Sequence, residues 1–247
     1  MEERWSSQYI PALEEFIRVP NLTVFCDPEF LTNGLIQEAK SVVSKFAKAL
    51  EIEGLSEHVV EEEGRPPMYI YLHEQADAPN LMFYGHLDKM PHCEGWEEPK
   101  HPTNPVTIGE WMFGRGSSDD GYAAFTVLLA MKAAQVQGKR LPRVCLVLET
   151  EEESGSDSLL FLLNKARDLT GVPDYCFCMD SGCMDYDRLW LTSSLRGVVN
   201  IDLKIEAAKT AYHSGEAGGV VPETFAVWRV LLDRLDDPAT GMVHEDF

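Results

Sequence analysis

Apolar residues recur along this chain with two spacings, one typical of helices and one typical of strands. The clearest helical spacing lies in residues 34–50, and residues 7–18 carry a shorter amphipathic pattern. Residues 121–136 are apolar on almost every side, which predicts a buried helix. Further helices are expected over residues 156–169 and from about residue 222 to 236.

Short runs rich in β-branched and aromatic residues lie between these helices and predict strands. They are residues 68–72, 81–84, 143–148 and 175–179, with a continuation at 188–192. Because strands and helices alternate up to about residue 180, the predicted class is α/β with a largely buried sheet. From Gly197 the pattern changes, and residues 198–205 alternate like a strand with one buried face.

This change predicts a domain boundary near residue 195, with one domain at 1–194 and a second unit at 195–247. The second unit contains one predicted strand, a glycine-rich loop and one predicted helix. Such a small set of elements rarely buries enough surface to fold alone. We therefore expect residues 195–247 either to pack on the first domain or to belong to a larger protein.

Composition narrows the class of protein. The chain has 247 residues, of which 45% are hydrophobic and 25% charged, and its net charge is −20. Such an acidic chain is a poor candidate for binding nucleic acid or an anionic membrane. The first residues lack an apolar signal core, so a cytoplasmic protein is expected. The six cysteines are scattered and predict buried, reduced thiols rather than a disulfide framework.

Acidic side chains follow the predicted strands at several points. They are Asp88, with His86 beside it, Asp119 and Asp120 at the start of the buried helix, Glu149, Glu151, Glu152 and Glu153 after strand 143–148, and Asp180 after strand 175–179. Each group alone has an ordinary explanation as a strand cap, a helix N-cap worth about 1 kcal/mol, a solvated loop or a turn. Ligands of α/β sheets collect outside the carboxyl ends of strands, so we expect these groups to meet.

Like charges gathered at the end of a sheet are unfavourable unless a cation is present. The pattern therefore predicts a pair of divalent metal ions. Oxygen and imidazole ligands without a thiolate suit zinc, with manganese or cobalt as alternatives. Two metals about 3.5–4 Å apart, bridged by a carboxylate, are a common arrangement for hydrolysis.

Taken together, the motifs resemble those of the aminoacylase–carnosinase family of dinuclear zinc metallopeptidases, in particular its carnosinase-like dipeptidases. The resemblance rests on the order and spacing of His86–Asp88, Gly114–Asp120, Glu152–Ser156, Asp180 and the lid motif Ala211–Gly219. It implies a three-layer mixed sheet with helices on both faces, as in zinc exopeptidases. Residues 195–247 would then be the start of an inserted α+β lid and dimerisation domain.

The resemblance also implies a role for each residue. His86 and Asp180 would bind the first metal, Asp119 would bridge both metals, and Glu153 would bind the second. Asp88 would orient His86, and Glu152 would be the general base. His213 would reach the active site of a neighbouring subunit, which implies a homodimer formed through the lid.

Two features depart from the family's pattern. Gly121 and Tyr122 stand where carnosinase-like members carry a Lys-Gly pair, and the family's last histidine ligand has no counterpart before Phe247. We therefore interpret the chain as a C-terminally incomplete form of a larger enzyme. The expected reaction is metal-dependent hydrolysis of the amide bond of dipeptides or related N-acyl amino acids. The alternatives are an N-acyl amino acid deacylase and a non-catalytic metal-binding fragment.

Overall fold

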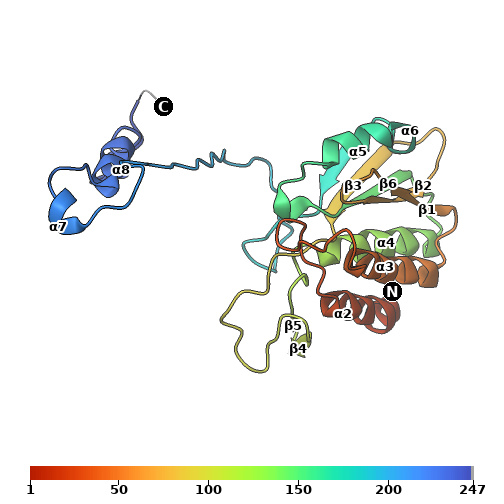
Figure 1. The fold of residues 1–247 in the computed structure, drawn as a ribbon. Helices are drawn as coiled ribbons and strands as arrows, with labels where there is room; N and C mark the ends of the chain where they lie inside the picture. The colour runs from red at the N-terminus through yellow and green to blue at the C-terminus, as the bar shows by residue number, and fades with distance from the viewer. Residues whose placement is uncertain (246–247) are drawn as a thin grey trace. The chain divides into compact units, whose positions relative to one another are not determined.

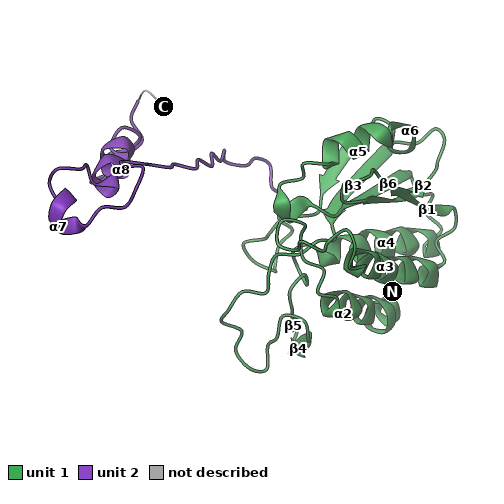
Figure 2. Ribbon diagram, viewed as in Figure 1, with its two compact units in different colours: residues 1–190 green, residues 191–247 purple. Residues whose placement is uncertain are grey.

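The computed structural model describes residues 1–245, and the last two residues of the predicted segment 195–247 lie outside that range. The chain divides into two compact units, Met1–Trp190 and a second unit that begins at Leu191 (Figure 2). The division falls close to the predicted boundary at residue 195. The roles of catalytic domain and lid stay predictions.

A mixed sheet of five strands forms the centre of the first unit. Its strands are β1 (Leu55–Val60), β2 (Met68–His73), β3 (Asn80–His86), β6 (Arg143–Glu149) and β7 (Tyr175–Cys178). They lie in the order β1-β2-β6-β3-β7. The pairs β1–β2 and β2–β6 are antiparallel, whereas β3 is parallel to both β6 and β7. The carboxyl ends of β3, β6 and β7 therefore lie at one edge, and the register sets His86 opposite Glu149.

Helices cover both faces of this sheet, which confirms the predicted three-layer α/β fold (Figure 1). Helices α2 (Ile10–Arg18), α3 (Leu35–Leu50) and α4 (Gly121–Val136) cover one face, and α5 (Leu159–Lys165) and α6 (Arg167–Thr170) cover the other. A short helix α1 (Glu2–Arg4) and a π-helical turn (Trp5–Tyr9) precede α2. A separate two-stranded ribbon is formed by β4 (Val106–Ile108) and β5 (Trp111–Phe113).

The larger core lies between the sheet and the helices α2, α3 and α4. Phe125 of α4 is fully buried at its centre, and Tyr9, Phe16 and Phe46 meet its ring edge-on at 5.2–6.1 Å between ring centroids. Edge-on aromatic pairs add stabilisation beyond the area they bury. This packing fixes α4, which begins two residues after Asp119, against α2, α3 and the π-helical turn.

Some predicted elements are absent or shorter. Residues 188–192 and 198–205 are not strands, and the helix predicted over 156–169 begins only at Leu159 and breaks at Ala166. A strand needs a neighbour for its backbone hydrogen bonds. Among the described residues, the second unit holds only an isolated bridge between Asp236 and Val243, besides the helices α7 (Ser214–Ala217) and α8 (Thr224–Leu232).

The edge strand β1 was not predicted, because the polar run Ser56, Glu57 and His58 interrupts its apolar pattern. All six cysteines are free thiols as predicted, but only Cys145 is buried. The prediction of buried thiols was therefore wrong for the others, which lie in loops and in the exposed strand β7. Among the described helices, none is both long and apolar enough to cross a membrane.

Candidate metal centre

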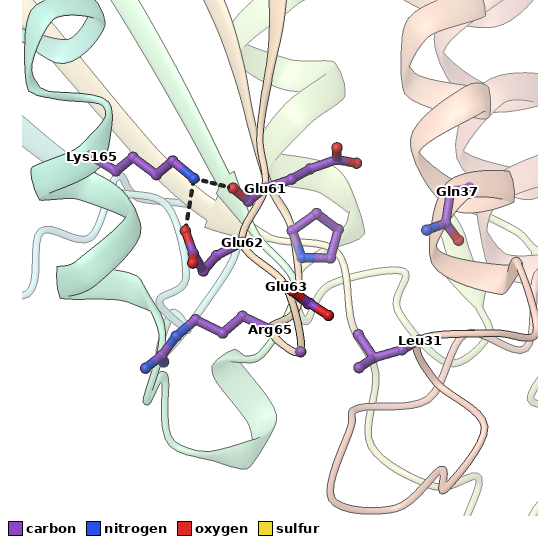
Figure 3. Close-up of a pocket in the computed structure, with 9 residues that line it drawn as sticks. Leu31, Gln37, Glu61, Glu62, Glu63, Arg65 and Lys165 are labelled. Carbon is purple, nitrogen blue, oxygen red and sulfur yellow. Dashed lines mark hydrogen bonds and ion pairs between the residues drawn. The ribbon is translucent and has the colours of Figure 1, made fainter.

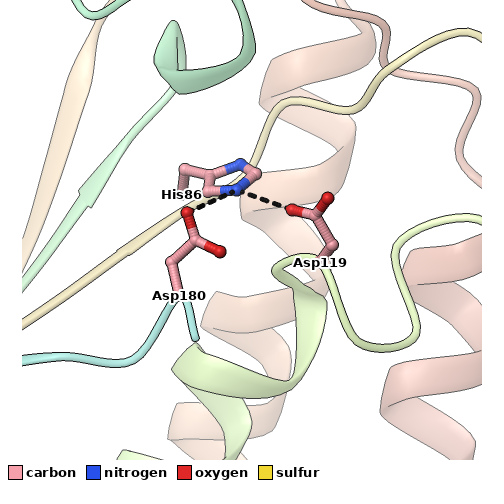
Figure 4. Close-up of side chains that lie close together, drawn as sticks. All are labelled: His86, Asp119 and Asp180. Carbon is pink, nitrogen blue, oxygen red and sulfur yellow. Dashed lines mark hydrogen bonds and ion pairs between the residues drawn. The ribbon is translucent and has the colours of Figure 1, made fainter. Parts of the chain in front are cut away.

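Three candidate ligands meet at the carboxyl edge of the sheet. His86 ends β3, Asp119 lies two residues before α4, and Asp180 lies two residues after β7. Nε2 of His86 is 3.1 Å from Oδ1 of Asp119 and 3.6 Å from Oδ2 of Asp180 (Figure 4). One ligand atom from each residue lies within 4.8 Å of the other two. The three side chains are thus close enough to share one metal ion.

Glu152 and Glu153 approach this cluster from the turn after β6. They begin a single 3₁₀ turn, Glu152–Ser154. Oε2 of Glu152 lies 3.8 Å from Nε2 of His86. Glu153 is not part of the three-residue cluster, and its Oε1 is buried without a hydrogen-bond partner among the described residues. Its role as ligand of a second metal stays a prediction.

Asp88 connects the histidine strand to the glutamate turn. Its side chain is fully buried, and its two carboxylate oxygens accept hydrogen bonds from the backbone N–H groups of Glu152 (3.2 Å) and Glu153 (3.1 Å). Nδ1 of His86 lies 3.0 Å from the carbonyl oxygen of Asp88 and 3.5 Å from its carboxylate. The nearest acceptor for the ring is therefore the backbone of Asp88, and its carboxylate holds the glutamate turn in place.

The cluster concentrates negative charge in a partly buried site. Burial opposes the imidazolium form of His86, but its hydrogen bonds to Asp119 and Asp88 favour that form more and raise its pKa to about 11. The hydrogen bond with His86 lowers the pKa of Asp119. Burial raises the pKa of Glu152 and Asp180, and burial together with the charge of Asp119 raises the pKa of Glu153 to about 7. A nearby positive charge would stabilise the ionised form of each of these carboxyl groups.

The residues present fit a divalent metal ion. They offer one imidazole nitrogen and several carboxylate oxygens, the ligand types that zinc and manganese accept. The unpaired, buried Oε1 of Glu153 is the kind of atom that a cation would satisfy. Held rigidly by strand ends, such a cluster can bind a metal without large rearrangement.

Two acidic residues at the site were not assigned a role from the sequence. Asp120 precedes α4, and its Oδ2 accepts a hydrogen bond from the backbone N–H of His86 (3.1 Å). Glu149 accepts hydrogen bonds from the hydroxyl groups of Tyr84 and Ser156. A Cβ atom at Gly85 would come within 2.6 Å of Oδ2 of Asp120, so the glycine leaves room for this carboxylate. The Asp119–Asp120 pair and the run of glutamates were the only signals that could have pointed to them.

His213, the remaining predicted catalytic residue, lies in the second unit. It is exposed at the start of α7, and its Nδ1 accepts a hydrogen bond from the backbone N–H of Gly215 (3.1 Å). In the first unit, Arg115 donates to the carbonyl oxygen of Pro91 at 3.1 Å. The glycine-flanked turn around Arg115 thereby supports the loop that follows His86 and Asp88.

A separate groove of about 560 Å³ lies beside the turn between β1 and β2 (Figure 3). Its cationic side chains are already paired. Lys165 donates to the carbonyl oxygen of Glu61 and to the carboxylate of Glu62, and Arg65 donates to the hydroxyl of Ser158. Among the described residues, the groove offers no set of convergent ligands comparable to the cluster around His86.

Comparison with known proteins places this fold among peptidases. Residues 82–224, more than half of the chain, match the model of peptidase family M20/M25/M40. A β-Ala-His dipeptidase of Rattus norvegicus is 30% identical over 181 residues, which cover 70% of this chain and 36% of the relative. Human carnosine dipeptidase 1 has a TM-score of 0.63 at 21% identity, over 98% of this chain and 52% of that chain. A dipeptidase of Saccharomyces cerevisiae has a TM-score of 0.66 at 20% identity, over 98% of this chain and 53% of that chain.

The mixed sheet with helices on both faces is thus the fold of solved dipeptidases. The chain belongs to peptidase family M20/M25/M40. It spans about a third of the length of the rat relative and about half of the length of the two solved chains.

Proposed function

We propose that this chain carries the metal-binding part of a hydrolase that cleaves the amide bond of dipeptides. The observation that carries the proposal is the convergence of His86, Asp119 and Asp180 within 4.8 Å, with Glu152 alongside. The family match supports peptide hydrolysis, and the similarity to β-Ala-His dipeptidase supports dipeptides as the substrate class.

The proposed cofactor is a pair of divalent ions, with zinc as the first choice. His86 and Asp180 would hold one ion, Glu153 the other, and Asp119 would bridge them. Such ions polarise a scissile carbonyl group and lower the pKa of a bound water, which is the chemistry that an unactivated amide bond needs. The raised pKa of the neighbouring carboxyl groups is consistent with a site built around a cation.

Glu152 is the proposed general base. Its side chain is one-third exposed, so it can reach both the cluster and a substrate in solution. It would take a proton from the attacking water at a carboxylate oxygen and later deliver that proton to the leaving amine. The hydrogen bond from its backbone N–H to Asp88 holds its position in the turn, so the carboxylate can remain close to the ligands without being one.

The proposed role of His213 predicts a homodimer in the full-length protein. Its exposure on the second unit and its glycine-flanked loop are consistent with a histidine that serves a neighbouring subunit. If it stabilises the developing oxyanion, His213→Ala should lower turnover by about 10²–10³-fold and leave the metal content unchanged. Mixing His213→Ala with Glu152→Gln subunits should restore activity, because each hybrid dimer then has one site free of both defects. Subunit exchange without recovery would contradict action across the interface.

Metal removal and a substrate panel test the proposed reaction. The full-length protein should hydrolyse dipeptides such as β-Ala-His, lose that activity with a chelator, and regain it with Zn²⁺. N-acetyl amino acids measured under the same conditions distinguish a deacylase, which would favour them over dipeptides. A protein that binds Zn²⁺ but hydrolyses neither class would instead be a metal-binding module.

A further inference from the structure

A buried lysine lies three residues after the candidate ligand His86. Lys89 is only 1% exposed, and its ammonium donates to the carbonyl oxygens of Phe16 and Val19, both at 2.7 Å. The same ammonium lies 4.2 Å from the centre of the Phe16 ring. In the described part of the chain, no ion pair joins Lys89 to a carboxylate. Burial lowers its pKa to about 7, so a charged lysine is costly at this position.

Lys89 ties the end of α2 to the loop that carries His86 and Asp88. We call residues 16–23, which run from the end of α2 to Thr23, the brace. The backbone N–H of Thr23 donates to the carbonyl oxygen of Lys89 (2.9 Å), and the side-chain amide of Asn21 donates to the carbonyl oxygen of Leu87 (2.5 Å). Asn21 and Thr23 are both 1% exposed. The brace therefore holds the histidine loop through four hydrogen bonds, all in the protein interior.

The brace also contacts the segment that leads to Asp119. A side chain at Gly116 would come within 2.6 Å of Cε of Lys89, and one at Gly121 within 2.7 Å of the Phe16 ring. A side chain at Gly114 would come within 2.5 Å of Ile17. The three glycines that flank Asp119 thus allow the segment 114–121 to lie directly against the brace and Lys89.

The third contact reaches the glutamate turn. The hydroxyl groups of Thr23 and Ser154 are 2.5 Å apart, and Ser154 ends the 3₁₀ turn that begins with Glu152 and Glu153. The backbone N–H of Phe25, just beyond the brace, donates to the same Ser154 hydroxyl at 3.0 Å. The brace is therefore in contact with the loops that carry His86, Asp119 and the two glutamates.

We propose that the brace, together with Lys89, sets the spacing of the metal-binding loops, and that Lys89 and Thr23 are the positioning residues. The inference deepens the proposed function and rests on the binding of a divalent ion at this site. Ligands must be held within about 0.5 Å to keep their geometry, and outer contacts of this kind commonly change metal affinity by about 10–100-fold. A lysine that is costly to bury is consistent with selection for position rather than for stability.

The test compares zinc affinity with stability in the same variants. Lys89→Met keeps an unbranched side chain one heavy atom shorter and removes the three donors, and Thr23→Val removes only the hydroxyl that meets Ser154. Zinc affinity is measured on the metal-depleted chain by competition with a chromophoric chelator, and thermal unfolding is measured without metal. Both variants should bind Zn²⁺ about 10–100-fold more weakly than the wild type, whereas Thr23→Ser should match it.

Ile70→Val is the matched control for stability. Ile70 is fully buried in β2, in the smaller core on the α5 side of the sheet, away from the brace. The substitution Ile70→Val should lower the melting temperature of the protein but not its affinity for zinc. The proposal is wrong if Lys89→Met and Thr23→Val bind Zn²⁺ with wild-type affinity. It is also wrong if Ile70→Val, at an equal loss of stability, loses as much zinc affinity as they do. If Lys89→Met fails to fold, the comparison of Thr23→Val with Thr23→Ser tests the proposal. Absence of zinc binding in the wild type would instead refute the proposed function itself.

Discussion

Replacing Glu152 with glutamine should lower dipeptide hydrolysis by the full-length protein by about two to four orders of magnitude. Glutamine has the shape of glutamate but cannot accept the proton of the attacking water at neutral pH. The backbone N–H of residue 152 would still donate to Asp88, so the turn should keep its position. Turnover of β-Ala-His at saturating substrate, together with zinc content, measures the effect.

The exposed Glu53 provides a matched control, because Glu53→Gln makes the same chemical change away from the cluster. That variant should keep both its activity and its metal. The informative result is the metal content of Glu152→Gln. If zinc is lost together with activity, Glu152 is a ligand rather than the base, and the proposed roles of Glu152 and Glu153 must be exchanged.

Replacing Asp119 with alanine should remove most of the bound metal from the chain. Asp119 lies 3.1 Å from Nε2 of His86 and is the proposed bridge, so its loss affects both ions at once. Elemental analysis after dialysis against trace zinc measures the effect directly and does not depend on turnover. His86 and Asp180 alone would leave one imidazole and one carboxylate, a set too small for tight zinc binding.

Asp157→Ala is the control for this second substitution, because Asp157 is an exposed aspartate in the loop before α5. It should bind as much zinc as the wild type. Equal zinc in Asp119→Ala and the wild type would contradict the bridging role. A loss of zinc accompanied by unfolding, seen by circular dichroism, would show that Asp119 acts through stability and not as a ligand.

The central part of the fold could be predicted from local pattern alone. Helix α4 spans the predicted residues 121–136, and β3 and β6 extend the predicted strands by one or two residues. Their apolar runs are continuous because each element is buried on most sides. Elements at the edge were harder to predict, as β1 shows, because a half-exposed strand tolerates polar residues that interrupt its period.

In the second unit, a strand was predicted that the structure does not contain. Residues 198–205 alternate as a strand should, but all of them except the half-buried Ile205 are exposed, and none is paired in a sheet. Alternation describes a preference for one buried face, whereas a strand also needs a neighbour that satisfies its backbone. The sequence shows the preference for one buried face, but whether a neighbouring strand is present depends on how other segments are arranged.

The sequence by itself determined that His86 and Asp180 lie at strand ends and that Asp119 lies just before a buried helix, and the resemblance of these motifs to a metallopeptidase family made them candidate ligands. Only the tertiary structure showed that their ligand atoms lie within 4.8 Å of one another. It also showed that the nearest acceptor for the His86 ring is a backbone carbonyl, and that Lys89 and Thr23 connect the end of α2 to the site. The physical reason is that burial imposes a spacing of apolar residues on each helix and strand, and this spacing marks in the sequence where the element begins and ends. Contacts between distant segments depend on packing, which leaves no such spacing.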